Sequence, residues 1–94
     1  MGTIIWTESS LEDLKEIKSF ISHVSKKFAN YFIDRLFHAS EILEKFPKIG
    51  KKIKSIQNSD YRMIIFKKYR IVYKEFEENV KIIRVLQANR LMDI

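Results

Sequence analysis

Four arginines in the second half of the chain are the residues best suited to chemistry: Arg62, Arg70, Arg84 and Arg90. A guanidinium stays charged in a protein, and its fork of donors matches the oxygens of a phosphate or a carboxylate. Such a group could stabilise charge that develops on a scissile phosphate. The alternative is that each arginine pairs with Glu75, Glu77 or Asp93, or lies on a solvated sheet face.

Arg70 is the arginine that we expect to contribute most. It lies inside the long strand pattern of residues 69–76, where a solvated face is least expected. Arg62 and Arg90 lie at the ends of strand patterns, where side chains are freer. We therefore predict a site in which Arg70, Arg90 and Arg62 contact a phosphate or a macromolecular target, with Arg70 the most important.

Other kinds of site have little support in the sequence. His23 and His38 fall on predicted helices, so we interpret them as surface or interhelical residues rather than as acid–base catalysts. The chain has no cysteine, and two histidines alone do not complete a typical zinc site. We expect no metal and no cofactor. Tyr61, Tyr69 and Tyr73 could stack on bases, but cross-strand packing is the favoured interpretation.

The positive charge of the chain is concentrated in its second half. Residues 1–44 carry 5 basic and 7 acidic groups, whereas residues 45–94 carry 13 basic and 5 acidic groups. The second half is therefore +8 and the first half −2, which favours encounter with nucleic acid or with an acidic protein. Neither a signal peptide nor a run of roughly 20 apolar residues is present, so we expect a cytoplasmic protein without a membrane partner.

Two helices are predicted after a short strand at residues 3–6. Thr7, Ser9 and Ser10 offer capping hydroxyls, and Ser9-x-x-Glu12 fits a capping box. Two apolar stripes at helical spacing follow: Leu11, Leu14, Ile17, Phe20, Ile21 and Val24, then Phe28, Phe32, Leu36, Ala39, Leu43 and Phe46. The break at residues 25–27 is short, and this predicts an antiparallel helical hairpin that ends at Pro47 and Gly50.

The pattern changes to a period of two after Gly50. A weak strand is predicted at residues 51–56, a turn at 58–60, and strong strands at 62–66, 69–76 and 80–86. The short separators indicate antiparallel neighbours. We predict an α+β fold over one domain, residues 1–94, with an N-terminal strand and an antiparallel helical hairpin packed on a four- or five-stranded, mainly antiparallel sheet.

Several motifs follow one another in a specific order along almost the whole chain. They are the strand ending in Trp6, the Leu11-x-x-Leu14 helix, the Phe46-Pro47-x-x-Gly50 turn, Arg62, the Tyr69-Arg70-Ile71-Val72-Tyr73 strand and the final strand closing on Arg90. Their order and spacing resemble the ParE/RelE superfamily, the toxins of bacterial type II toxin–antitoxin systems. The resemblance implies the same fold, a cognate antitoxin that wraps the toxin in a hetero-oligomer, and a target in replication or translation.

Two mechanisms divide this superfamily. RelE-like members cut messenger RNA in the ribosome with arginines that grip the phosphate, often helped by a C-terminal tyrosine or histidine, whereas ParE-like members poison DNA gyrase. Arg70 and Arg90 match the RelE-type arginines. However, no tyrosine or histidine follows Leu86, and Gln87 stands where many members place a histidine. We expect a ParE-like toxin; the alternatives are a RelE-like mRNA endonuclease, which alone would be an enzyme, and a non-toxic basic module that binds nucleic acid or protein.

Overall fold

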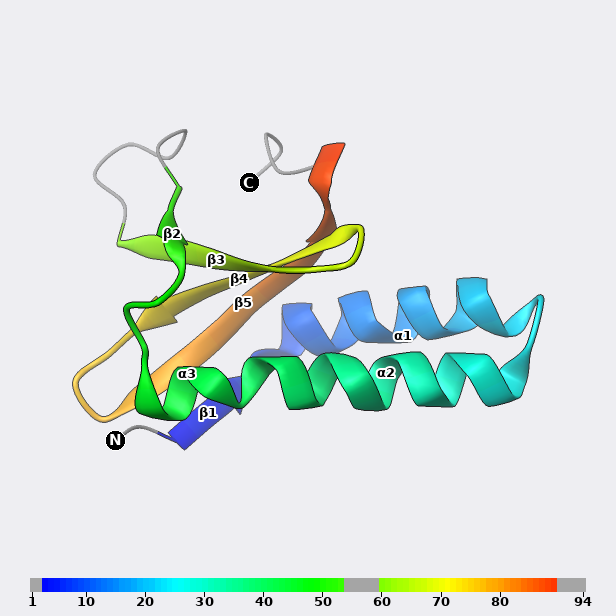
Figure 1. Cartoon of the computed structure of the whole chain (residues 1–94), viewed down its shortest axis with the longest axis horizontal. Coiled ribbons are helices and arrows are strands. Elements are labelled where there is room, and N and C mark those ends of the chain that lie inside the picture. Colours follow the sequence, from blue (N-terminus) through cyan, green and yellow to red (C-terminus); the bar gives the residue numbers. More distant parts are fainter. Residues whose placement is uncertain (1–2, 54–59, 90–94) are drawn as a thin grey trace.

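A computed structural model describes residues 3–53 and 60–89 of the 94-residue chain. Eight elements lie within these ranges (Figure 1). In chain order they are β1 (Thr3–Trp6), α1 (Glu8–Ser22), α2 (Lys26–Ser40), α3 (Ile42–Lys45), β2 (Lys51–Lys52), β3 (Tyr61–Phe66), β4 (Tyr69–Glu75) and β5 (Asn79–Gln87). No helix in the described ranges is long and apolar enough to cross a membrane.

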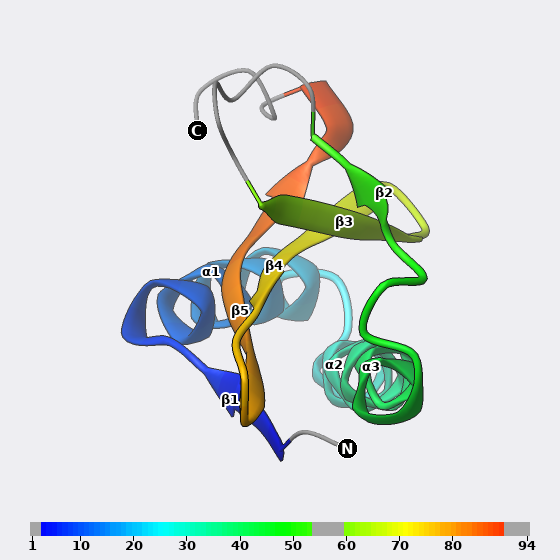
Figure 2. The ribbon, with the colours of Figure 1, turned by 90° about the vertical axis from the view of Figure 1, so that its left-hand side faces the viewer.

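The strands form one mixed sheet in the order β1-β5-β4-β3-β2. Strands β2 to β5 make an antiparallel meander. The N-terminal strand β1 lies at the edge beside β5 and pairs with it in parallel, from Thr3↔Asn79 to Trp6↔Ile82. The sheet twists strongly, so that β3 crosses the direction of β5 in Figure 2. The predicted α+β fold, with a helical hairpin on a five-stranded, mainly antiparallel sheet, is confirmed.

The four strands predicted after Gly50 all have different bounds in the structure: β3 begins one residue earlier, β5 extends one residue further at each end, and the other two are shorter. The weak strand predicted at residues 51–56 is reduced to β2, which has two residues, and residues 54–56 lie outside the described part of the chain. The predicted turn at 58–60 lies outside it too, except for Asp60. Strand β4 ends at Glu75, so Phe76 belongs to the turn before β5 rather than to the strand.

The first helix begins at one of the three hydroxyl residues predicted to cap it, but without the predicted capping box. Thr7 is the N-cap, and its Oγ1 accepts a hydrogen bond from Ser10 N at 3.2 Å. Ser9 lies inside the helix, so the predicted capping box is wrong. The reason is tertiary: Thr7 Oγ1 also donates to Ile82 O at 2.7 Å, which fixes the point where the chain leaves the sheet. At the second helix Ser25 is the N-cap and accepts from Phe28 N.

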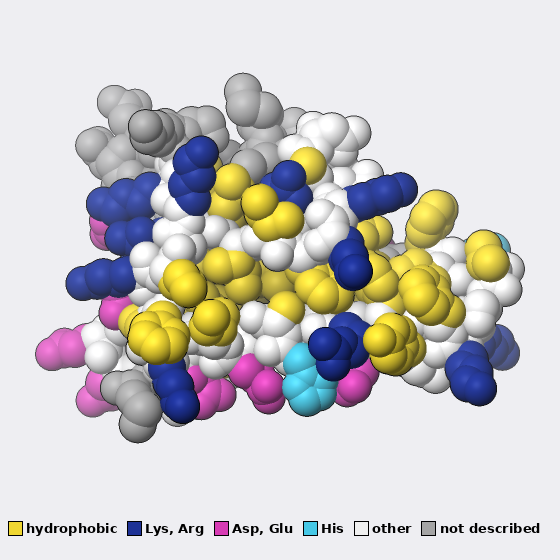
Figure 3. Space-filling view, viewed as in Figure 1, with side chains coloured by type: hydrophobic (Ala, Val, Ile, Leu, Met, Phe, Trp, Pro, Cys, Tyr) yellow, Lys and Arg dark blue, Asp and Glu magenta, His cyan; other side chains and the backbone are white. Residues whose placement is uncertain are grey.

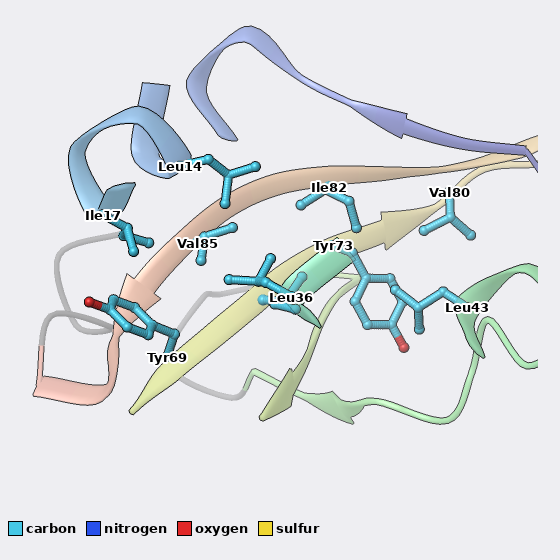
Figure 4. Packing of buried hydrophobic residues seen from close by; sticks show 10 residues of the cluster. Leu14, Ile17, Leu36, Leu43, Tyr69, Tyr73, Val80, Ile82 and Val85 are labelled. Atoms are coloured by element: carbon cyan, nitrogen blue, oxygen red, sulfur yellow. The ribbon is translucent and has the colours of Figure 1, made fainter. Parts of the chain in front are cut away.

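The hydrophobic core lies between the helices and one face of the sheet (Figure 4). Its buried members are Leu14, Ile17, Leu36, Leu43, Tyr69, Ile71, Tyr73, Val80, Ile82 and Val85. Several residues of the predicted stripes are instead exposed: Leu11, Phe20, Val24, Phe28 and Phe46. Phe20 and Val24 are 71% and 91% exposed because the tip of the helical hairpin extends past the sheet (Figure 1).

Candidate functional site

A buried tyrosine joins two of the motifs identified in the sequence. The hydroxyl of Tyr73 donates to Pro47 O and accepts from Gly50 N, both at 2.8 Å. Burial raises the pKa of this phenol above its usual value near 10, and the Gly50 amide and the charge of Arg62 oppose the rise. A side chain at position 50 would collide with the Tyr73 hydroxyl and lie 2.7 Å from Met63 O. The Pro-x-x-Gly turn is therefore held by strand β4.

Arg62 is engaged with the same turn. Its Nη1 donates to Gly50 O at 2.8 Å and to Lys48 O at 3.2 Å. Since Arg62 pairs with Tyr73 across β3 and β4, both side chains reach the turn from the core side of the sheet. Its guanidinium thus has a structural role in holding residues 48–50.

Arg70 lies on the opposite face of the sheet from Arg62. It pairs with Ile65 on β3 and Leu86 on β5, and side chains alternate along a strand, so Arg70 points away from the core. Its Nη1 makes a 3.2 Å hydrogen bond to the backbone oxygen of Tyr69. The structure therefore places Arg62 and Arg70 on different surfaces, and the third predicted site residue, Arg90, lies outside the described residues.

Arg84 is paired, but not with the acidic residues that we expected. Its Nε and Nη2 donate to Asp13 of α1 at 2.8 and 3.0 Å, and Asp13 also accepts from Val85 N at 2.8 Å. The hydrogen bonds to Asp13 raise the pKa of the Arg84 guanidinium. The hydrogen bonds of Asp13 therefore connect α1 to the part of β5 that follows Ile82, where the pairing of β5 with β1 ends. A signal for this ion pair was present in the sequence: Asp13 directly precedes Leu14, and both residues lie on the buried side of the helix.

Both histidines lie on the exposed surface of the helices. His23 Nδ1 lies 2.8 Å from Ser19 O of its own helix, and His38 lies beside Glu41 at 3.1 Å and Asp34 at 3.7 Å, all on exposed helical surface. The ranges that the structure describes hold no group of three or more potential metal ligands. The interpretation of both histidines as surface residues agrees with this geometry.

An apolar groove of about 540 Å³ opens between the tip of the helical hairpin and the β3–β4 turn. Six aromatic rings line it: Phe20, Phe28, Tyr31, Phe32, Phe66 and Tyr69. The ring of Phe32 is central, because its centroid lies 5.3 Å from that of Phe66, 5.8 Å from that of Tyr69 and 6.1 Å from that of Phe28. Phe20, Phe28 and Phe32 were predicted to lie in apolar helical stripes and Tyr69 in cross-strand packing, and the groove itself was not predicted. Figure 3 shows a band of hydrophobic side chains between the helices and the sheet, with lysines and arginines on both sides of the band and acidic residues mostly along the helical edge.

The rim of this groove is basic. Arg35, Lys67 and Lys68 line the groove, as does the polar side chain of Gln87. Lys67 adopts φ of 57°, and it is the one described residue other than glycine with a positive φ. For a lysine this left-handed conformation costs roughly 1–2 kcal/mol relative to the helical or extended regions. A cation is therefore held at the tip of the turn in a conformation that glycine would adopt more readily.

The fold and these motifs together define a class of protein. The family described as "ParE toxin of type II toxin-antitoxin system, parDE" matches residues 4–92, and the chain belongs to this family. The match spans the Pro-x-x-Gly turn, the Tyr-Arg strand and the helical hairpin in one alignment. The recognition of a ParE/RelE superfamily toxin from the sequence is confirmed.

A solved structure has the same fold. The chain is similar to a chain of the chromosomal ParDE toxin–antitoxin system from P. aeruginosa, with a TM-score of 0.78 over 93% of this chain and 96% of that one. The two sequences are 13% identical, so the likeness concerns the fold alone. No curated protein matches the chain.

Proposed function

We propose that this chain is a growth-inhibiting toxin that acts on DNA gyrase and is neutralised by a cognate antitoxin, with which it forms a hetero-oligomer. Membership of the ParE toxin family supports the general activity. The observation that carries the antitoxin half of the proposal is the apolar groove with its basic rim. Large exposed apolar surfaces on small proteins are typical of binding sites.

The groove indicates the chemistry of the segment that fills it. Its aromatic floor favours an amphipathic segment whose apolar side chains enter between Phe28, Phe32 and Phe66. Its rim cations, Arg35, Lys67 and Lys68, favour acidic side chains along the border of that segment. The antitoxin segment that we propose is therefore apolar on one side and acidic on its flanks.

The choice of gyrase over the ribosome rests on what surrounds the arginines. Arg62 is committed to the turn at Gly50, and Arg70 lies on the other face of the sheet. In the described ranges both histidines bond within the helices, so neither stands beside Arg70 as a proton-transfer group. This arrangement supports a protein that inhibits by binding rather than by cutting RNA.

The antitoxin interaction is testable by titration calorimetry of the purified pair from low to high salt. We expect the affinity to fall as salt rises, because screening weakens the contribution of the exposed rim cations. Replacing Phe32 with alanine should abolish binding at every salt concentration, since it empties the groove floor. An affinity independent of salt would contradict the electrostatic part, and tight binding by the Phe32 variant would contradict the groove.

The target is testable by inducing the toxin in a bacterial host and following two readouts in parallel. Gyrase inhibition predicts altered supercoiling and gyrase-dependent DNA breaks, while messenger RNA stays intact. New transcript ends on ribosomes with intact DNA would instead establish the RelE-like endonuclease. Growth arrest with neither effect would contradict both targets.

A further inference from the structure

Two lysines face each other on the outer side of the sheet, away from the helices. Lys74 of β4 pairs directly with Lys81 of β5, and both side chains are half-buried. Like charges in such a cross-strand pair repel each other and destabilise the sheet. Among the described residues neither ammonium group has a carboxylate partner within ion-pair distance. The repulsion between the two lysines therefore lowers the stability of the free protein, and a bound anion would relieve it.

An aromatic ring positions this pair. The Nζ atoms of Lys74 and Lys81 lie 5.2 and 5.0 Å from the centroid of Phe76, so the two charges are at most about 10 Å apart. The Lys74 Nζ is also 5.7 Å from the centroid of Tyr61. Phe76 is 39% exposed at the turn between β4 and β5. Contacts of this kind contribute about 0.5–1 kcal/mol each at exposed sites, enough to favour one arrangement of the lysines.

We infer that Lys74, Phe76 and Lys81, the lysine platform, form a binding site for the phosphodiester backbone of a nucleic acid. A phosphate offers acceptor oxygens that two ammonium groups can share, and contact with it relieves their repulsion. The partly exposed ring of Phe76 adds an apolar surface of the kind on which bases pack in single-stranded sites. A flexible acidic peptide supplies negative charge but no planar base to pack on Phe76. The platform therefore fits a nucleic acid better than an acidic peptide.

The platform is separate from the groove. In Figure 1 the β4–β5 turn beside the platform lies at the left end of the long axis, whereas the β3–β4 turn that lines the groove lies right of the middle, toward the tip of the helical hairpin. The acidic residues nearest in sequence do not neutralise it: Glu75 alternates to the core side of β4, while Glu77 and Glu78 are exposed in the turn. This site therefore extends the proposed function without depending on the identity of the target.

Fluorescence anisotropy with the full chain alone tests the inference, using a labelled oligonucleotide of about 20 nucleotides as single-stranded DNA, duplex DNA or RNA. The double variant Lys74→Gln with Lys81→Gln should raise the Kd about tenfold and lower the salt slope by about 1.4 to 1.8, the value for two lost phosphate contacts. The matched control, Lys26→Gln with Lys27→Gln on the first turn of α2, loses the same charge elsewhere. It should change the Kd less than about threefold. Circular dichroism and thermal melting check that every variant is folded.

A second variant distinguishes a specific site, formed by the ring and both lysines, from binding that depends on net positive charge alone. Phe76→Leu keeps both lysines and the net charge but removes the ring that both ammonium groups contact, and should raise the Kd about threefold or more. The ranking of the three oligonucleotides identifies which nucleic acid the platform prefers. Equal losses in the platform and control variants would overturn the inference, as would an unchanged Kd in Phe76→Leu. Competition by polyglutamate as effective as unlabelled DNA would overturn it in favour of an acidic protein. None of these outcomes bears on gyrase inhibition, which the induction experiment measures separately.

Discussion

Replacing Tyr73 with phenylalanine removes a single oxygen atom that two backbone groups depend on. The hydroxyl accepts from Gly50 N and donates to Pro47 O, each at 2.8 Å. The ring of phenylalanine fills the same space beside Leu36 and Leu43, so the core packing should be retained (Figure 4). Any loss of stability then reports the two hydrogen bonds rather than a cavity.

The magnitude follows from the burial of the partners. Gly50 is buried, so its amide would lose the Tyr73 hydroxyl as hydrogen-bond partner in a place that water does not easily reach, at a cost of about 1–3 kcal/mol. Pro47 is half-buried, and water can satisfy part of its carbonyl, so the second loss is smaller. We expect the free energy of unfolding to fall by about 2–4 kcal/mol, a large part of the 5–15 kcal/mol typical of a domain.

Equilibrium urea denaturation measures this loss. The midpoint should fall by about 1–3 M, with an unchanged m-value, because the surface exposed on unfolding is the same. Tyr31→Phe is the matched control: it removes the same atom from a side chain that is 60% exposed, and should change stability by less than about 0.5 kcal/mol. A Tyr73→Phe midpoint within error of the parent would refute the argument that this hydroxyl holds the turn.

The same variant gives a second readout at alkaline pH. Burial raises the pKa of Tyr73 in the folded state, so the folded protein keeps this proton at pH values where the unfolded chain has lost it. The contribution is therefore fully present below pH 10, the usual pKa of tyrosine, and declines as pH rises toward the folded-state pKa. The stability difference between parent and Tyr73→Phe should narrow above pH 10 in urea titrations, and a widening difference would contradict the direction of the shift.

Three further predictions concern single side chains. Lys67→Gly should raise the free energy of unfolding by up to about 1 kcal/mol, because glycine adopts the positive φ without strain. The same variant should bind the antitoxin more weakly in calorimetry, and binding as tight as that of the parent would show that Lys67 does not contact the antitoxin. Arg70→Ala should lower toxicity in a growth assay with stability unchanged, and Arg70→Lys should restore it only if a point charge suffices; full toxicity of a folded alanine variant would exclude this surface. Leu36→Ala should cost about 2–5 kcal/mol in urea denaturation and abolish toxicity through instability, and a stable, toxic variant would contradict its place in the core.

Much of the fold was predictable because local patterns and tertiary structure agree. The alternation of residues 69–76 and 80–86 predicted strands β4 and β5 to within one residue at each end, and the short separators predicted their antiparallel pairing. The pairing of β1 was not predictable in the same way. It joins residues more than 70 positions apart, and its register depends on Thr7 bonding to Ile82 O, which no local spacing signals.

The site was predicted less well, because side-chain direction depends on register. Arg62 and Arg70 both lie in strong strand patterns, but the pairing of β3 with β4 sets them on opposite faces. The rings of Phe20 and Phe28 fit helical core stripes, and only the length of the hairpin relative to the sheet leaves them exposed. An apolar stripe specifies which side of a helix is apolar, but not how far along the helix a partner covers it.

The separation of the two proposed surfaces constrains how an antitoxin could act. A helical segment of about 10 residues is about 15 Å long, whereas the molecule extends 39 Å along its long axis. A segment that fills the groove at the hairpin tip therefore leaves the β4–β5 end uncovered (Figure 1). If the lysine platform holds nucleic acid, an antitoxin in the groove alone would not displace it, and neutralisation would have to block a protein target at the groove end. An antitoxin that also covers Lys74 and Lys81 would need a second, acidic segment long enough to cross the sheet.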